Sequence, residues 1–251
     1  MTSTARLEAV VFDVDGTLVD SERDGHRVAF NLAFEAFGLP YRWDEVTYGQ
    51  LLRTTGGQRR LHGYLSAAGM PAAERDQLVP ALHDRKTALM TELVDDGAVG
   101  VRPGAERLLQ ELAEAGVALA VATTGSRGWV ERLLARLLPG IGLGVIVTGD
   151  EVEARKPDPE AFTTALGRLG LPASAAVAVE DSAEGLTSAK GAGLATVIVV
   201  NGYTADHDTS TAELVLDGFG EPDHPAQVIA DRNHTGCAGV LDRAVLERVL
   251  G

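Results

Sequence analysis

Short apolar segments that alternate with helical segments constrain the fold of this chain more than any other feature of its sequence. A strand rich in β-branched residues is predicted at Leu7–Phe12, and further strands are predicted at 117–122, 145–148, 176–179 and 195–200. Helices are predicted before and between the later strands, at 105–115, 127–138, 159–169 and 183–192. This alternation is typical of a mostly parallel sheet with helices on both faces. We therefore expect an α/β core with a Rossmann-like, doubly wound parallel sheet.

The stretch from Asp20 to Asp95 follows a different pattern. Apolar residues recur in it at three- and four-residue spacing, and no strand of comparable strength interrupts them. We therefore expect two domains, a catalytic core formed by residues 1–19 and 96–251 and an inserted all-α helical cap at 20–95. Asp217–Gly239 is rich in Gly, Pro and His and is predicted to be irregular. The sequence leaves open whether residues 217–251 pack on the core or fray.

Composition excludes several classes of function. The net charge of −14 argues against nucleic-acid binding, which requires a basic surface. The longest stretch without charge, Gly191–Ala205, is shorter than the roughly 18 apolar residues of a membrane span and contains Asn201. Cys237 is the single cysteine, which fits a reducing compartment, and no secretory signal is visible. We expect a soluble cytoplasmic protein, monomeric and without nucleic-acid or membrane partners.

Lysine is scarce in this chain. It contains 3 lysines against 19 arginines, which suggests that a position retaining Lys needs a compact ammonium rather than a planar guanidinium. The alternative for any single lysine is a solvated surface position. Its neighbouring motif favours a functional role for Lys156, whereas Lys190 fits a helix surface better and Lys86 carries no motif.

Groups suited to phosphoryl transfer follow several predicted strands. The strand at Leu7–Phe12 ends in Asp13-Val14-Asp15-Gly16-Thr17, and the next strand ends in Thr123-Thr124-Gly125. Lys156 precedes a predicted helix start, and the strand at 176–179 ends in Glu180-Asp181-Ser182. Ligands bind beyond the carboxyl ends of parallel strands, where paired carboxylates favour a divalent cation such as Mg²⁺. The alternative for each acidic pair by itself is an ordinary turn or helix cap.

The four motifs DVDGT (13–17), VATT (121–124), KPDP (156–159) and VEDS (179–182) closely resemble those of the haloacid dehalogenase superfamily of phosphohydrolases, in the same order. The resemblance spans roughly Leu7 to Val200. It implies a Mg²⁺-dependent phosphatase that acts through an aspartyl-phosphate. The helical insert resembles the α-helical cap of that superfamily.

The resemblance also implies roles for individual residues. Asp13 corresponds to the nucleophile, and Asp15 to the general acid and later base. Thr123 corresponds to the phosphate-binding hydroxyl, with Thr124 beside it, and Lys156 to the ammonium that orients the nucleophile. The implied metal ligands are Asp13, the carbonyl of Asp15, Asp181 and the adjacent Glu180.

Three parts of the cap resemble the CbbY-like group of this superfamily, which implies a sugar bisphosphate such as xylulose-1,5-bisphosphate as the substrate. The candidate substrate-binding residues are Glu22, His26, Arg53, Thr54, Thr55, Gly56, Gly57 and Arg60. Physically, hydroxyls, backbone amides and arginines provide a grip for a second phosphate that does not react. The alternatives are an ordinary turn at the glycine pair and an ordinary polar residue at position 26.

Two other functions share this chemistry. A phosphomutase resembling β-phosphoglucomutase would use the same four motifs and return the phosphoryl group to another hydroxyl. A signalling receiver domain also phosphorylates an Asp at a strand end, but Asp15 and the helical insert argue against it. A scaffold without activity is a remote alternative because the four motifs are intact.

Overall fold

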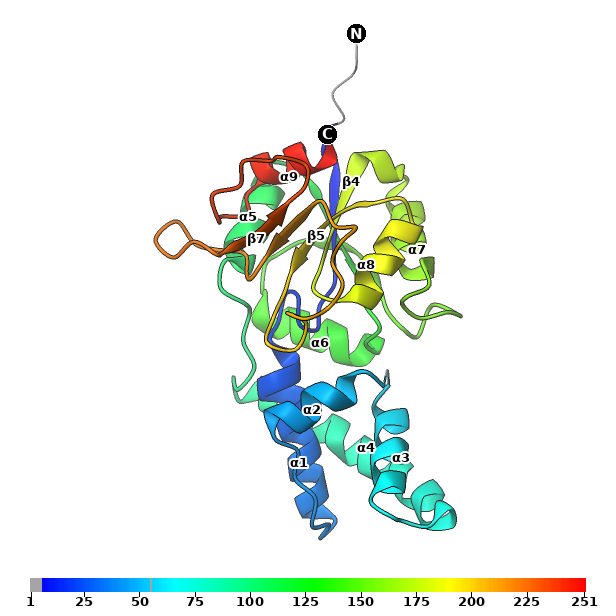
Figure 1. Cartoon of the computed structure of the whole chain (residues 1–251). Coiled ribbons are helices and arrows are strands. Elements are labelled where there is room, and N and C mark those ends of the chain that lie inside the picture. Colours follow the sequence, from blue (N-terminus) through cyan, green and yellow to red (C-terminus); the bar gives the residue numbers. More distant parts are fainter. Residues whose placement is uncertain (1–5, 55) are drawn as a thin grey trace. The chain divides into compact units, whose positions relative to one another are not determined.

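The computed structural model describes residues 6–54 and 56–251 (Figure 1). The chain forms two compact units, one containing Val101–Gly251 with the chain as far as Val19, the other Asp20–Gly100. The second boundary thus lies at Gly100 rather than at Asp95. The backbone amide of Asp20 donates to the carbonyl of Gly100 at 3.4 Å, which joins the two ends of the inserted unit.

The larger unit, here called the core unit, contains a seven-stranded sheet formed by the described residues, in the order β3-β2-β1-β4-β5-β6-β7. Neighbouring strands are parallel except for β6 and β7, which run antiparallel. The strands are β1 (Ala9–Phe12), β2 (Ala118–Ala122), β3 (Leu143–Val147), β4 (Ala176–Glu180), β5 (Ala195–Val199), β6 (Leu214–Leu216) and β7 (Val228–Asp231). The predicted α/β fold with a mostly parallel sheet is confirmed.

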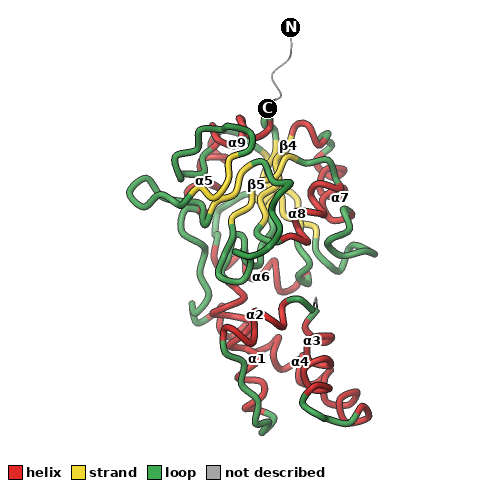
Figure 2. Tube along the Cα trace, in the orientation of Figure 1, coloured by secondary structure: helices red, strands yellow, loops and turns green. Residues whose placement is uncertain are grey.

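Helices lie on both sides of the strands in the core unit (Figure 2). They are α5 (Ala105–Glu114), α6 (Arg127–Leu137), α7 (Glu160–Leu169), the short 3₁₀ helix η2 (Ala173–Ala175), α8 (Ala183–Gly191) and α9 (Arg243–Leu250). α7 packs on β2 and β3, whereas α8 packs on β4 and β5. Phe162 of α7 is buried in a cluster with Val11 and Ala120 of the sheet. All residues of β1 and β4 are buried, as expected for strands covered on both faces.

The C-terminal segment packs on the core rather than fraying. α9 lies against α5, β4 and β5, and it buries Val245, Leu246 and Val249. The prediction of an irregular segment at 217–239 is wrong at β7, which pairs with β6. Both strands are too short to show an alternation of apolar and polar residues in the sequence. In addition, β7 lies at the end of the sheet and pairs with a neighbour on one side only.

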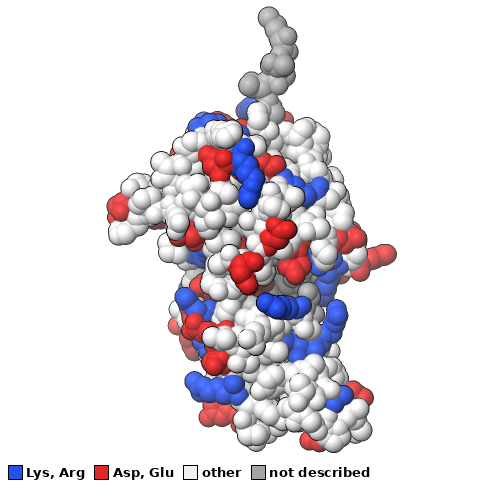
Figure 3. Space-filling view, viewed as in Figure 1, with Lys and Arg blue, Asp and Glu red and all other residues white. Residues whose placement is uncertain are grey.

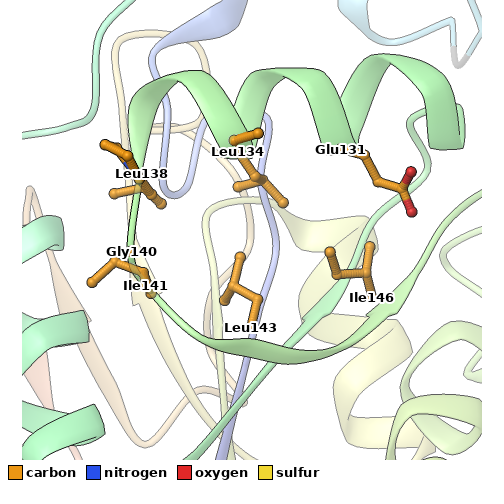
Figure 4. A pocket seen from close by; sticks show the side chains of 9 residues that line it. Glu131, Leu134, Leu138, Gly140, Ile141, Leu143 and Ile146 are labelled. Carbon is orange, nitrogen blue, oxygen red and sulfur yellow. The ribbon is translucent and has the colours of Figure 1, made fainter.

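A groove of about 540 Å³ lies between α6 and β3, the strand at the other end of the sheet (Figure 4). Its walls are mostly apolar and include Leu134, Leu138, Leu143 and Ile146, with Glu131 at one end. None of the candidate site residues lines it. The residues that line the groove also include no Lys or Arg, so it offers no positive charge to an anion. The groove is therefore not the site that the motifs predict.

The smaller unit, here called the cap unit, consists of helices and the loops between them, with no strand among its described residues. It contains the π-helix η1 (Glu22–His26), α1 (Arg27–Ala36), α2 (Glu45–Leu52), α3 (Gly57–Ala67) and α4 (Ala72–Asp95). Trp43 is fully buried at its centre, with ring centroids 4.8 and 4.9 Å from those of Phe30 and Phe34. Asn31 fixes the Trp43 backbone through two hydrogen bonds of 2.7 and 2.8 Å. The aromatic residues of this unit thus form its core.

Charge is mixed on the surface. Figure 3 shows acidic and basic side chains interspersed with uncharged residues on the face in view. Among the described residues, no helix has both the length and the apolar composition that crossing a bilayer requires.

Candidate active site

The register of the sheet brings three of the motifs to one edge. Phe12, the last residue of β1, is paired with Val121 on one side and with Val179 on the other. Asp13 therefore leaves the sheet between the ends of β2 and β4, where its backbone amide donates to the carbonyl of Val179 at 3.0 Å. Because the three strands are parallel, their carboxyl ends and the side chains that follow them meet there.

Lys156 joins these strand ends. Its ammonium donates to Asp13 Oδ1 at 2.7 Å, to the carbonyl oxygen of Ala122 at 2.8 Å, and to Glu180 Oε1. The residue is buried, and its ammonium lies 4.9 Å from the ring centroid of Phe162. A compact ammonium with three donors satisfies all three acceptors, which a planar guanidinium would not match.

Glu180 links Lys156 to the start of α8. Its second oxygen, Oε2, accepts from the amides of Asp181 and Ser182 at 3.0 and 3.4 Å and from the Ser182 hydroxyl at 3.3 Å. A Cβ on Gly185 would lie within about 2 Å of the Glu180 carboxylate, so this position has room for glycine alone. Both Glu180 oxygens are thus engaged by protein donors, which suits a residue that orients Lys156 better than a direct metal ligand.

The turn after β1 is held tightly. The amide of Gly16 donates to the carbonyl of Val19 at 2.8 Å, and the Thr17 hydroxyl donates to Asp181 Oδ1 at 3.3 Å. Gly16 has a φ of +89°, and a Cβ there would lie 2.6 Å from Asp181 Oδ2. Glycine is therefore required for both the backbone conformation and the close approach of the turn to Asp181.

Asp15 belongs to the same turn and lies near Gly125. It is partly exposed, and its Oδ2 lies 3.5 Å from the position that a Cβ on Gly125 would occupy. Thr123 is buried in the same strand-end segment, and its hydroxyl accepts from the Gly125 amide at 3.2 Å. Thr124 is partly exposed beside it. The structure therefore brings Asp15 close to the segment of the predicted phosphate-binding hydroxyls.

Burial and mutual repulsion raise the pKa values of the buried aspartates. Desolvation raises the pKa of Asp13, the charge of Lys156 lowers it and the charge of Glu180 raises it, so that the net pKa is about 8. Desolvation likewise raises the pKa of Asp181 well above its ordinary value, with further repulsion from Glu180 and Asp13. Burial lowers the pKa of Lys156, but the charges of Asp13 and Glu180 more than reverse this, so the net pKa is raised.

The donor set fits a hard divalent cation. Carboxylate oxygens of Asp13, Glu180 and Asp181 lie within 4.8 Å of one another, and all three residues are buried. The single positive charge of Lys156 offsets only part of the negative charge of the three carboxylates. The buried carboxyls of Asp13 and Asp181 therefore have raised pKa values. A cluster of buried oxygen ligands with excess negative charge matches the preference of Mg²⁺.

In the cap unit, one hydrogen-bonded chain joins two of the predicted substrate-binding residues. The Tyr48 hydroxyl donates to Glu22 Oε2 at 2.5 Å and accepts from Arg60 Nη1 at 3.2 Å. Arg60 is buried and also donates to the carbonyl of Leu51 at 3.1 Å. Its position in the sequence suggested an exposed or phosphate-binding arginine, whereas the structure shows it joining η1, α2 and α3.

A second cluster in the cap unit contains a residue that the sequence analysis missed. Lys86 on α4 is buried, and its ammonium lies 2.9 Å from Nδ1 of His26 and 4.9 Å from the ring centroid of Phe30. Burial lowers the pKa of nearby His83, and the charge of Lys86 lowers it further. The scarcity of lysine was the signal, but without a motif it could not separate Lys86 from Lys190. Lys190 instead forms an ion pair with Glu213.

The loop between α2 and α3 contains the remaining predicted cap residues. Arg53 is exposed, and the amide of Thr54 donates to the carbonyl of Leu51 at 3.0 Å. Gly56 has a φ of +93°, and a Cβ on Gly57 would lie 2.6 Å from Nε2 of His83. Local geometry thus accounts for both glycines. Thr55 lies outside the described residues.

Two further residues near the acidic cluster were not predicted from the sequence. Arg102 donates to the carbonyls of Gly16, Val199 and Val200 at 2.7 to 2.8 Å. Asn201 donates to Asp181 Oδ2 at 2.7 Å. Their partners lie far away in the chain, so no local pattern marked them.

Comparison with known proteins gives consistent results. Residues 7–193 match the family described as haloacid dehalogenase-like hydrolase. Protein CbbY of Rhodobacter capsulatus is 41% identical over 210 residues, covering 82% of this chain and 91% of that protein. A phosphoglycolate phosphatase of Xanthomonas campestris is 31% identical over 207 residues, covering 80% and 86%. A crystal structure of CbbY from Rhodobacter sphaeroides in complex with xylulose-(1,5)bisphosphate matches with a TM-score of 0.74 and 38% identity, covering 84% of this chain and 94% of that one.

Proposed function

The chain belongs to the haloacid dehalogenase-like hydrolase family and is a CbbY-like phosphatase, and from this premise we propose that it hydrolyses a sugar bisphosphate with the help of Mg²⁺. The candidate substrate is xylulose-1,5-bisphosphate, the ligand in the similar CbbY structure. The observation that carries the proposal is the buried cluster in which Lys156 binds Asp13 beside Glu180 and Asp181.

In the proposed reaction, an Asp13 carboxylate oxygen attacks phosphorus and the bond to the leaving sugar oxygen breaks. Asp15 gives its proton to that oxygen, and an aspartyl-phosphate remains on Asp13. Asp15 then takes a proton from a water molecule, whose oxygen attacks phosphorus; the bond between phosphorus and the Asp13 oxygen breaks, which releases inorganic phosphate and restores the Asp13 carboxylate. Lys156 holds the Asp13 carboxylate and supplies positive charge next to the transferred group.

The Mg²⁺ ion, when bound, neutralises negative charge on the nucleophile and the phosphoryl oxygens. Asp13 and Asp181 are the side chains that we propose as its ligands, together with the backbone carbonyl of Asp15. Glu180 holds Lys156 and the amides of Asp181 and Ser182 just before α8, so we assign it an orienting role rather than direct ligation.

We propose that the cap unit binds the phosphate that is not transferred. Arg53 and the N-terminus of α3 provide guanidinium and amide donors, and the ammonium of Lys86, which lies beside His26, adds further positive charge. Thr54, Gly56 and Gly57 form the loop that would approach the phosphate.

The nucleophile is tested with Asp13→Asn. The amide is a poor nucleophile, so phosphate release should fall below about one thousandth of the parent rate. The melting temperature should not fall, because the substitution removes a buried carboxylate whose pKa is already raised. The control is Asp223→Asn at an exposed position, which should keep the parent rate. Substantial turnover by Asp13→Asn would contradict the mechanism.

The substrate is tested by measuring phosphate release from a panel of sugar mono- and bisphosphates, with and without Mg²⁺. We expect a Mg²⁺-dependent preference for a bisphosphate, with xylulose-1,5-bisphosphate and β-glucose 1-phosphate as the informative members. Arg53→Ala should raise KM for the preferred bisphosphate about tenfold or more and leave monophosphate hydrolysis nearly unchanged. Arg59→Ala is the matched control at another exposed position.

The panel also separates the alternatives. Isomerised sugar phosphate without phosphate release would favour a mutase resembling β-phosphoglucomutase. Equal low rates on all monophosphates would contradict the second phosphate site. The match to hydrolases over residues 7–193 disfavours a receiver domain. The cytoplasmic location and the monomeric state stay predictions from the sequence.

A further inference from the structure

The segment after β5 contributes a side chain to the acidic cluster from outside the residues that match the family. The match ends at residue 193, and Asn201 follows β5. The side-chain amide of Asn201 donates to Asp181 Oδ2 at 2.7 Å and to the carbonyl of Gly16 at 3.2 Å. It therefore connects the turn after β1 to the carboxylate after β4.

The orientation of this amide is determined by its other partner. The backbone N–H of Tyr203 donates to Asn201 Oδ1 at 2.8 Å. A peptide N–H only donates and the Gly16 carbonyl only accepts, so the oxygen of the amide must face Tyr203 and its nitrogen must face the acidic cluster. The backbone N–H of Asn201 donates to the Thr204 hydroxyl at 3.0 Å, which fixes the backbone as well.

Asn201 acts on a carboxylate that would otherwise be held on one side only. Thr17 donates to Asp181 Oδ1 at 3.3 Å, and Asn201 donates to the other oxygen at the shorter distance of 2.7 Å. Asp181 is buried and repelled by Glu180 and Asp13. The two donors on opposite oxygens oppose a rotation of the carboxylate away from that repulsion.

We propose that Asn201 is a positioning residue, which holds the Asp181 carboxylate and the Asp13–Gly16 turn in a fixed relation for Mg²⁺ binding and phosphoryl transfer. The proposal rests on the proposed function for the identity of the metal. Outer partners of metal ligands typically contribute about 10- to 100-fold to metal affinity or activity. Arg102 supports the same turn, because it donates to the Gly16 carbonyl at 2.7 Å.

The test compares Asn201→Ala and Asn201→Asp with the parent protein. Ala removes both the donor to Asp181 and the acceptor for Tyr203, whereas Asp keeps an acceptor oxygen for Tyr203 but replaces the donor to Asp181 with a carboxylate oxygen, which adds negative charge beside Asp181. The matched control is Asn233→Ala in the same unit, whose side chain donates to the carbonyl of Val249 at 3.0 Å. Mg²⁺ binding is measured by calorimetry without substrate, kcat and KM with p-nitrophenyl phosphate, and the melting temperature by circular dichroism.

We expect Asn201→Ala to weaken Mg²⁺ binding by about tenfold or more and to lower kcat with a smaller change in KM. Asn201→Asp should lower kcat by a similar factor although its turn is preserved. Asn233→Ala should change the melting temperature alone. The proposal is overturned if Asn201→Asp matches the parent while Asn201→Ala loses only thermal stability. A parent protein that binds no Mg²⁺ would overturn the metal assignment of the proposed function, and kcat of Asn201→Asp would still decide the role of Asn201.

Discussion

Lys156 and Lys190 both form ion pairs with carboxylates, but they differ in burial. Lys156 is buried between the Asp13 and Glu180 carboxylates. Lys190 pairs with Glu213, and a quarter of its side chain remains exposed. Removing one partner from a buried cluster leaves the remaining charges without solvent or a counter-charge. In a partly exposed pair, water solvates the remaining partner, so the loss of stability is small.

We therefore predict different stability losses for the two lysines. In Mg²⁺-free buffer, Lys156→Ala should lower the free energy of unfolding by about 3–5 kcal/mol and abolish phosphate release. Lys190→Ala should lower it by about 0–1 kcal/mol and keep the parent activity. Urea unfolding of both variants measures the difference. Equal losses would show that the Lys156 cluster is not the desolvated site described above.

At the scale of elements, α8 packs on β4 next to the site. The amides of Asp181 and Ser182, which precede α8, bind Glu180 Oε2, and the Ser182 hydroxyl caps the helix by accepting from the Gly185 amide at 3.1 Å. Gly185 leaves room for the Glu180 carboxylate, although glycine lowers helix stability elsewhere. Glycine at position 185 thus lowers the helix propensity of α8 but leaves space for the charged side chain of Glu180.

Two helical glycines test this interpretation. Gly185→Ala places a Cβ within about 2 Å of the Glu180 carboxylate, so it should destabilise the protein by about 1–3 kcal/mol and lower kcat. Gly167→Ala on α7 has nothing within 4 Å of its Cβ and should be neutral or stabilising by about 1 kcal/mol. Thermal unfolding and phosphate release are the measurements. A neutral Gly185→Ala would mean that Glu180 has another position available.

At the scale of the whole molecule, the acidic cluster couples cation binding to stability. Asp13, Glu180 and Asp181 are brought together only in the folded chain, so a cation bound at this cluster would bind the native state in preference to the unfolded one. Within this cluster, the pKa values of Asp13 and Asp181 are raised when no cation is present. Folding therefore stores repulsion in the cluster, and a bound cation would relieve it.

Mg²⁺ is accordingly expected to raise the melting temperature, by several degrees when its concentration is about 100 times its dissociation constant. Asp181→Asn should reduce this rise, and Asp223→Asn at an exposed position should not. Differential scanning calorimetry with Na⁺ at matched ionic strength separates specific binding from screening. An equal rise in all three proteins would contradict a specific cation site.

The sequence by itself determined the α/β alternation and the order of the four motifs, because strand and helix periodicity and strand-end chemistry are local properties. It also placed Asp13, Lys156 and Asp181 after strands whose carboxyl ends must meet in a parallel sheet. The cap residues were less determined. Arg60 and Lys86 carry charges that are usual at a surface, and only packing shows that both are buried.

Tertiary structure alone decided the strand order, the pairing of β6 with β7 and the partners of Asn201. Short strands such as β6 and β7 contain too few residues to show an alternation of apolar and polar side chains. Their pairing depends on which neighbouring strand still has an unpaired edge. Asn201 lies 185 residues from Gly16 in the chain, and its amide binds that carbonyl because parallel strands end at one edge. Contacts of this kind arise from the summed packing of helices and strands, and local sequence does not encode them.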